Sequence, residues 1–180
     1  MDTVHLVAIM APGSAEARIG RVQAALFSSS GLLSAQALPP LVPVAFVQPP
    51  RSVTGFLSTL ASRAGSPWRV RTARFFWCDG WLFLGTSTDG MWGRVREAAA
   101  RAAQPAPGSL FPVAEGFFAG CGEARQEGSI AAATAVPDLW FSAARIVLLK
   151  IQSPREQGEW WREVRWEIVE SHPLRGRRKT

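Results

Sequence analysis

Two kinds of apolar periodicity along the chain predict its strands and its helices. A continuous or alternating apolar run indicates a strand, whereas apolar positions three and four residues apart indicate a helix. These patterns predict strands over 4–10, 41–47, 71–78, 81–85, 110–118, 144–151 and 158–170, and helices over 14–27, 53–64 and 91–103. Strands and helices in this order are typical of an α+β protein with antiparallel strand pairs.

The clearest local feature is a pair of aromatic strands on either side of Asp79-Gly80. Both residue types tolerate the positive φ angles of a two-residue type I′ turn, so the segment predicts a hairpin. Ser87, Thr88 or Asp89 supplies the cap of the helix that follows, because each side chain carries an oxygen that accepts a backbone N–H.

We expect the apolar faces of the first helix and of the last strand to lie in the core. These residues are Ile19, Val22, Leu26 and Phe27 on the helix, and Trp160, Val164, Trp166 and Ile168 on the strand.

The pentapeptide Leu-x-Pro-Val-Ala occurs twice, at 41–45 and at 110–114. The repeat suggests a duplicated strand, and chance recurrence in a chain rich in Ala and Pro is the alternative. Alternation along the first strand places Leu41, Pro43, Ala45 and Val47 on one face, and Val42, Val44 and Phe46 on the other. Proline in a strand requires an edge or a bulge, so we expect the nitrogens of Pro43 and Pro112 to face away from ladder partners.

Composition indicates a globular protein, with 47% apolar and 19% charged residues in a chain of 180. Four of the six net positive charges come from Arg175, Arg177, Arg178 and Lys179, so the rest of the chain is nearly neutral. This basic tail either attracts nucleic acid or an acidic surface, or is simply a solvated terminus.

No cofactor, metal site or membrane segment is predicted. Cys78 and Cys121 have neither the spacing of metal ligands nor that of a disulfide framework, and the sequence assigns them no function. The apolar N-terminal run is too short to span a bilayer and lacks a preceding basic segment. We therefore expect a cytoplasmic protein.

The candidate polar sites are few. His5 and His172 lie at opposite ends of the chain. An arginine-rich aromatic segment surrounds the hairpin, and such a segment either binds single-stranded RNA or buries its rings under arginine stems. Its residues are Trp68, Arg69, Arg71, Arg74, Phe75, Phe76, Trp77 and Trp81.

The order of elements and the spacing of the two pentapeptides resemble the 2H phosphoesterase superfamily, which includes the bacterial 2′-5′ RNA ligase-like proteins. The resemblance implies a two-lobed fold in which antiparallel sheets surround a central groove, with helices on the outside. It covers residues 1–174 as a single domain and leaves 175–180 as a tail. In that family each lobe contributes a strand with the motif His-x-Thr/Ser, and the matching groove positions here are Leu41, Pro43, Leu110 and Pro112.

The family opens cyclic phosphodiesters, or joins RNA ends, with two imidazoles that exchange protons across a phosphate. Leucine and proline provide neither proton transfer nor a hydrogen-bond donor. The resemblance therefore implies a noncatalytic relative with no catalytic residues of the family type. Its ligand would be a nucleotide or an RNA end, with His5, Arg71 and Arg74 as candidate contacts.

Two alternatives remain open. One is a protein interaction module that binds its partner, or a second copy of itself, through an apolar groove or exposed tryptophans. The other is an enzyme with relocated chemistry, whose raw material would be His5, Cys121 and the carboxylates Glu115, Glu123 and Glu127.

Overall fold

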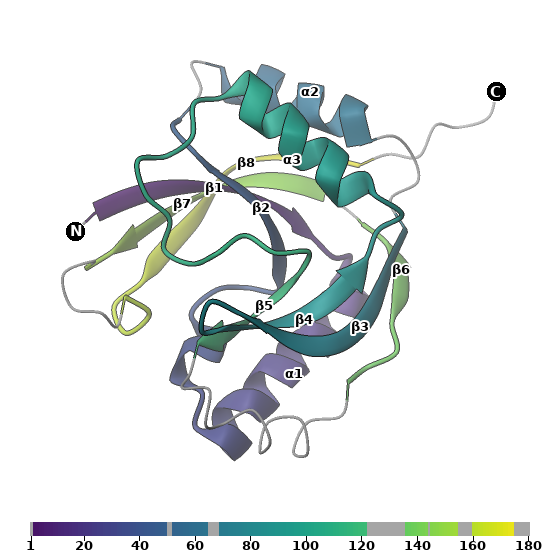
Figure 1. Cartoon of the computed structure of the whole chain (residues 1–180), viewed down its shortest axis with the longest axis vertical. Helices are drawn as coiled ribbons and strands as arrows, with labels where there is room; N and C mark the ends of the chain where they lie inside the picture. Colours follow the sequence, from purple (N-terminus) through teal and green to yellow (C-terminus); the bar gives the residue numbers. More distant parts are fainter. Residues whose placement is uncertain are drawn as a thin grey trace.

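The computed structural model describes residues 2–49, 52–64, 69–121, 136–143, 145–154 and 160–174. Within these ranges the chain forms two antiparallel sheets and three α-helices (Figure 1). In chain order the elements are β1 (Asp2–Met10), α1 (Gly13–Ser30), η1 (Leu33–Gln36), β2 (Leu41–Val47), α2 (Val53–Ala64), β3 (Arg69–Cys78), β4 (Trp81–Ser87), α3 (Met91–Ala102), β5 (Gly116–Cys121), β6 (Trp140–Ser142), β7 (Arg145–Ser153) and β8 (Arg165–Pro173). Trp68, Glu123, Glu127 and the basic tail lie outside the described residues.

The two sheets have the strand orders β2-β1-β7-β8 and β5-β4-β3-β6. Helices α2 and α3 cover the outer face of the first sheet, and α1 lies against the second (Figure 1). Each sheet contains the same unit, in which a strand, a helix and a neighbouring antiparallel strand follow in sequence: β1-α1-β2 and β4-α3-β5. The expected α+β fold with two antiparallel sheets is confirmed, and β2 and β5 occupy equivalent places in it.

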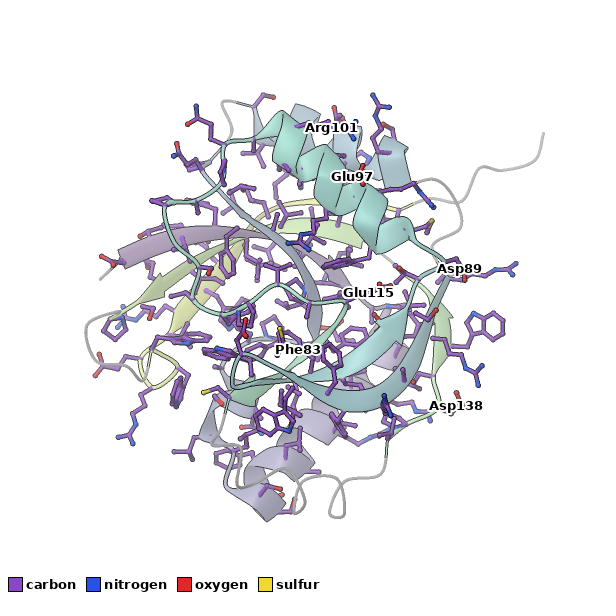
Figure 2. All side chains as sticks on the ribbon, in the orientation of Figure 1. Phe83, Asp89, Glu97, Arg101, Glu115 and Asp138 are labelled. Carbon is purple, nitrogen blue, oxygen red and sulfur yellow. The ribbon has the colours of Figure 1, made fainter. Side chains whose placement is uncertain are left out.

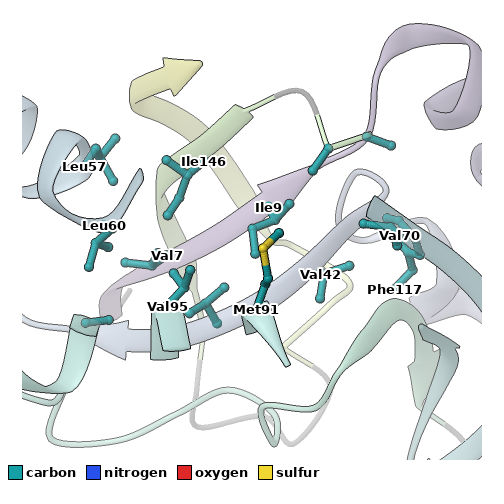
Figure 3. Close-up of a cluster of buried hydrophobic side chains, with 14 of the residues drawn as sticks. Val7, Ile9, Val42, Leu57, Leu60, Val70, Met91, Val95, Phe117 and Ile146 are labelled. Carbon is teal, nitrogen blue, oxygen red and sulfur yellow. The ribbon is translucent and has the colours of Figure 1, made fainter. Parts of the chain in front are cut away.

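Two large clusters of buried side chains hold the layers together. The first, which we call the helix-side cluster, brings Leu57 and Leu60 of α2 against Val7, Ile9 and Ile146 of the first sheet (Figure 3). The second, which we call the inter-sheet cluster, lies between the two sheets. Its members include Leu6, Ala8, Met10, Leu41, Phe46, Phe83, Leu110, Phe111, Phe118, Val147, Leu149 and Trp160.

A β-bulge at Val44 changes which residues of β2 share a face. In the pairing with β1, Ala8 faces Pro43 and Val7 faces Ala45, so Val44 is the additional residue. Such an insertion reverses the alternation of side chains beyond it. Phe46 therefore joins Leu41 in the inter-sheet cluster, and the predicted shared face of Val42, Val44 and Phe46 is wrong.

Strand β2 also meets both conditions that admit a proline. Among the strands that the structure describes, β2 pairs with β1 and lies at the edge of the sheet, and the bulge follows Pro43 directly. Near its end, Val47 also forms an isolated bridge with Pro105. The Pro43 carbonyl oxygen accepts a hydrogen bond from the indole Nε1 of Trp92, which lies 2.9 Å away on α3. The open edge is thus partly covered by a side chain rather than by another strand.

The second pentapeptide is not a strand. Residues 110–114 run as an irregular segment, and β5 begins only at Gly116, so the predicted strand over 110–118 is wrong in its first half. Leu110 and Phe111 are nevertheless buried, at 9% and 2% exposure. The apolar pattern reflects burial in the inter-sheet cluster, which needs no backbone ladder, and Pro112 has no N–H for one.

The predicted turn between β3 and β4 is confirmed. Asp79 and Gly80 have φ angles of 49° and 79°, as the type I′ turn requires. Two expectations of burial are wrong, since Phe27 is 41% exposed and Trp166 is 42% exposed. Phe27 follows Leu26 directly and so lies a third of a turn from the centre of the buried face.

The last strand is also displaced from its predicted position. It spans Arg165–Pro173 instead of 158–170, and it forms the outer edge of the first sheet. Trp160 precedes it and is buried in the inter-sheet cluster at 5% exposure. Because an edge strand is only partly covered by neighbouring layers, its apolar alternation overstates its burial.

Candidate functional site

The first motif position lies inside a packed group of aromatic rings. Leu41 has no exposed surface and joins the inter-sheet cluster. In that cluster the ring centroids of Phe46 and Phe111 are 5.1 Å apart, and those of Phe111 and Trp160 are 5.8 Å apart. Trp81 lies 5.7 Å from Trp160 between ring centroids. Rings therefore occupy the space between the sheets around Leu41.

The second motif position can be assigned either from the repeated pentapeptide or from the topology, and it is apolar in both cases. If the pentapeptide marks it, the residues are Leu110, which is buried, and Pro112, which is half-buried. If the topological equivalent of β2 marks it, the strand is β5, with the sequence Gly-Phe-Phe-Ala-Gly-Cys. Neither Leu110 and Pro112 nor the residues of β5 carry an imidazole or a hydroxyl group.

Both histidines lie on the other face of the first sheet. His5 pairs with Val47 of β2 and shares the helix-side face with Val7. Burial, followed by the nearby charge of Lys150, lowers the pKa of His5 below its ordinary value of 6.5. His172 pairs with Ile146, also on the helix-side face, and lines a surface depression beside α2. Neither imidazole faces Leu41 across the inter-sheet cluster.

The carboxylate of Glu115 has a structural role at the start of α3 (Figure 2). It accepts a hydrogen bond from the Thr88 hydroxyl, and the Thr88 oxygen accepts one from the backbone N–H of Trp92 at 3.1 Å. The N-cap residue itself is Gly90, which has no side chain, so the prediction of Ser87, Thr88 or Asp89 at that position is wrong. Thr88, two residues before it, nevertheless satisfies one free N–H in the first turn of the helix.

The two cysteines flank one tryptophan. Cys78 pairs with Trp81 across β3 and β4, and Trp81 pairs with Cys121 across β4 and β5. Two strand spacings separate the cysteines by roughly 9–10 Å, which is too far for a disulfide. Among the described residues, no three metal-ligating side chains gather at one place. Within the same ranges, no helix is long and apolar enough to cross a membrane.

An apolar cavity of about 400 Å³ lies beside the edge strand β2. Its wall includes Val44 to Val47, the end of α3 and Val113, and the guanidinium of Arg96 lies 5.2 Å above the Trp92 ring at its side. The chain beyond α3 closes part of this edge, since Ala106 N–H donates to the Phe46 carbonyl at 3.2 Å.

A basic and aromatic surface lies where β3 pairs with β6. Arg71 is directly opposite Trp140, and Arg69 is opposite Ser142. Val70 and Phe141 point inward to the helix-side cluster, so these arginines and Trp140 occupy the opposite face. Trp140 is 69% exposed, the largest exposure among the apolar side chains of this surface. We call Arg69, Arg71 and Trp140 the β3–β6 surface.

Of the predicted contacts, Arg71 belongs to this surface and His5 does not. Arg74 is exposed further along β3, beyond the residues that pair with β6. Arg71 also forms an ion pair with Asp138, at 3.6 Å between Nε and Oδ1. The rings of Phe75, Phe76, Trp77 and Trp81 are half-buried and contribute to the core clusters. Sequence patterns missed Trp140, because β6 has only three residues and shows too little alternation to be recognised.

By sequence, no protein-family model and no curated protein matches the chain. The structure is similar to that of Escherichia coli LigT complexed with 3′-AMP, with a TM-score of 0.59 and 17% identity over 96% of this chain and 98% of LigT. The protein TT0787 of Thermus thermophilus has a TM-score of 0.59 and 17% identity, covering 97% of this chain and all of TT0787. A further structure described as a phosphoesterase has a TM-score of 0.54 and 15% identity, over 96% of this chain and 99% of the other.

These likenesses extend over almost the whole length of both partners in each comparison. At such low identity they show a shared fold and nothing more. The chain therefore has the two-lobed fold of LigT and the phosphoesterases, and the resemblance seen in the sequence is confirmed at the level of the fold.

Proposed function

We propose that this protein is a noncatalytic relative of the 2H phosphoesterases that binds single-stranded RNA. The observation that carries the noncatalytic part is the burial of Leu41 among aromatic rings, where the family would need an accessible imidazole. A ligand phosphate cannot reach this position without displacing the packed core. The two histidines of the chain lie on the other face of the sheet.

The β3–β6 surface supports RNA as the ligand. An exposed tryptophan offers a face on which a base stacks, and neighbouring arginines neutralise phosphates of the backbone. Trp140 and Arg71 stand side by side in this arrangement, and Arg69 extends it along β3. The solved structures of LigT with 3′-AMP and with ATP show that this fold accommodates nucleotides in another protein.

Binding is tested by fluorescence anisotropy with a labelled single-stranded oligouridine of about ten nucleotides. Trp140→Ala is expected to weaken binding by about 1–3 kcal/mol, the value of one base stacked on a ring. Arg69→Ala and Arg71→Ala are each expected to lower the slope of log affinity against log salt by about one, because each removes a cation that neutralises a phosphate.

The control is Trp166→Ala on β8, because that ring is also exposed but lies at the edge of the other sheet. A chain that lacks residues 175–180 separates the contribution of the basic tail. Equal loss of affinity in Trp140→Ala and Trp166→Ala, or complete loss on removal of the tail, would contradict the proposed surface.

The noncatalytic part is tested separately with 2′,3′-cyclic nucleotides and purified protein. We expect no turnover above that of buffer. Turnover that disappears in His5→Ala or in His172→Ala would show that the imidazoles act from their present positions, and the noncatalytic assignment would then be wrong.

A further inference from the structure

A cavity of about 380 Å³ is lined by residues of α2 and α3. Three arginines line it: Arg63 from the last turn of α2, and Arg94 and Arg101, two turns apart on α3. Thr59, Glu97, Ala98 and Ala102 complete the wall. We call this cavity the α2–α3 cleft. It shares no residue with the β3–β6 surface.

The charges of the cleft are only partly compensated. Among the described residues of the wall, Glu97 is the one acidic residue, and it pairs with Arg101 at 2.9 Å (Figure 2). Arg63 and Arg94 form no ion pair with any residue that the structure describes. The wall therefore carries a net charge of +2, and two of its guanidinium groups have all their side-chain donors available.

The position of Arg94 is unfavourable for a helix on its own. Arg94 lies in the first turn of α3, which contains no acidic residue, and its guanidinium reaches back close to Gly90. The positive end of the helix dipole repels a cation there, whereas an anion at the same place would be stabilised. Arg63 adds a second like charge from the opposite helix.

We propose that the α2–α3 cleft binds the terminal phosphoryl group of a small phosphorylated ligand or of an RNA 5′ end. Guanidinium groups match phosphate oxygens with paired, charge-assisted hydrogen bonds. Cavities of this size accept small ligands. A bound phosphoryl group would offset both the repulsion between Arg63 and Arg94 and the unfavourable interaction of Arg94 with the helix dipole.

The test is calorimetric titration of the full chain with inorganic pyrophosphate. Binding is expected for the unmodified protein, and Arg63→Ala/Arg94→Ala is expected to weaken it by about tenfold or more. Glu97→Gln removes the acidic group and releases Arg101, so its affinity is expected to rise. This gain cannot arise from misfolding, which only weakens binding. The matched control is Arg18→Ala/Arg21→Ala, two exposed arginines on α1.

A second titration compares one RNA sequence with a 5′-phosphate and with a 5′-hydroxyl, in the Trp140→Ala background. A preference for the 5′-phosphate that depends on Arg63 and Arg94 identifies an RNA end as the source, and equal binding of the two RNAs beside tight pyrophosphate binding identifies a small ligand. No pyrophosphate binding, or equal loss in the cleft variant and the α1 control, overturns the proposal. It is also overturned if Glu97→Gln weakens binding.

Discussion

Leu41 and Leu110 pack in the same buried cluster between the two sheets, although Leu41 belongs to a strand and Leu110 to an irregular segment. Their exposures are 0% and 9%. The two places where the resemblance aligns catalytic histidines thus converge in space, and they converge on a core of aromatic rings. Both leucines are therefore part of the core that joins the two sheets.

Truncation of Leu41 is expected to destabilise the protein strongly. Leu41→Ala should lower the free energy of unfolding by about 2–5 kcal/mol, because it leaves a cavity in a closed cluster. Leu33→Ala is the control, since Leu33 is 52% exposed on η1; its cost should stay within about 0.5 kcal/mol. Urea denaturation measures both. Similar costs for the two variants would show that Leu41 is not packed as described.

Removal of the Thr88 hydroxyl is expected to weaken the start of α3. Thr88→Val keeps the shape of the side chain but removes the cap on Trp92 N–H and the hydrogen bond to Glu115. The expected loss is about 1–2 kcal/mol in thermal or urea unfolding. Ser87→Ala changes the neighbouring exposed hydroxyl and should have almost no effect. A larger loss of stability for Ser87→Ala than for Thr88→Val would show that Thr88 does not stabilise the start of α3.

Two glycine substitutions should act in opposite directions. Gly80 has a φ of 79° in the hairpin turn, so Gly80→Ala should destabilise by about 1–2 kcal/mol. Gly93 lies within α3, and an added Cβ would meet nothing within 4 Å. Gly93→Ala should stabilise by about 0.5–1 kcal/mol, since alanine favours the helix. Differential scanning calorimetry measures the change in thermal stability of both variants. If Gly93→Ala destabilises the protein, the space around Gly93 is not open.

The lowered pKa of His5 makes stability depend on pH. Because the folded state releases its proton more readily than the unfolded state, protonation favours unfolding. Stability is therefore highest above the ordinary pKa of 6.5 and declines as the pH falls from there through the folded pKa. His5→Gln should show a smaller decline in Tm between pH 7 and pH 5 than the unmodified chain. Identical pH profiles would remove His5 as the cause.

Local patterns were sufficient to predict most of the individual elements. The strand at 41–47, the helix at 53–64 and the hairpin around Asp79-Gly80 agree with the structure because their information is local. Apolar spacing sets the face of a helix, and turn residues set the sign of φ. The order of these elements was also sufficient to suggest the phosphoesterase fold, which the structural comparisons confirm.

Other features depended on packing that no short segment encodes. The bulge at Val44 turns Phe46 to the opposite face, and it exists only in the pairing of β2 with β1. Residues 110–114 have the composition of a strand, but they are buried in the inter-sheet cluster without forming a strand. The exposure of Trp166 follows from the place of β8 at the edge of the sheet.

The candidate binding surfaces also combine features that the sequence predicts with features that depend on tertiary packing. The arginines of β3 were recognisable in the sequence, but their neighbour Trp140 was not, because the pairing of β3 with β6 joins segments far apart in the chain. The α2–α3 cleft likewise combines Arg63 with Arg94 only after the two helices pack.

The sequence by itself thus determined most of the elements, their order and the absence of a histidine at either repeated motif, because residue types and their periods are properties of the chain. Only the tertiary structure decided which apolar residues close the space between the sheets, and which charged and aromatic side chains meet at its surface. Those outcomes depend on register and packing between distant segments. The partner of each strand and its place in the sheet determine which side chains are buried.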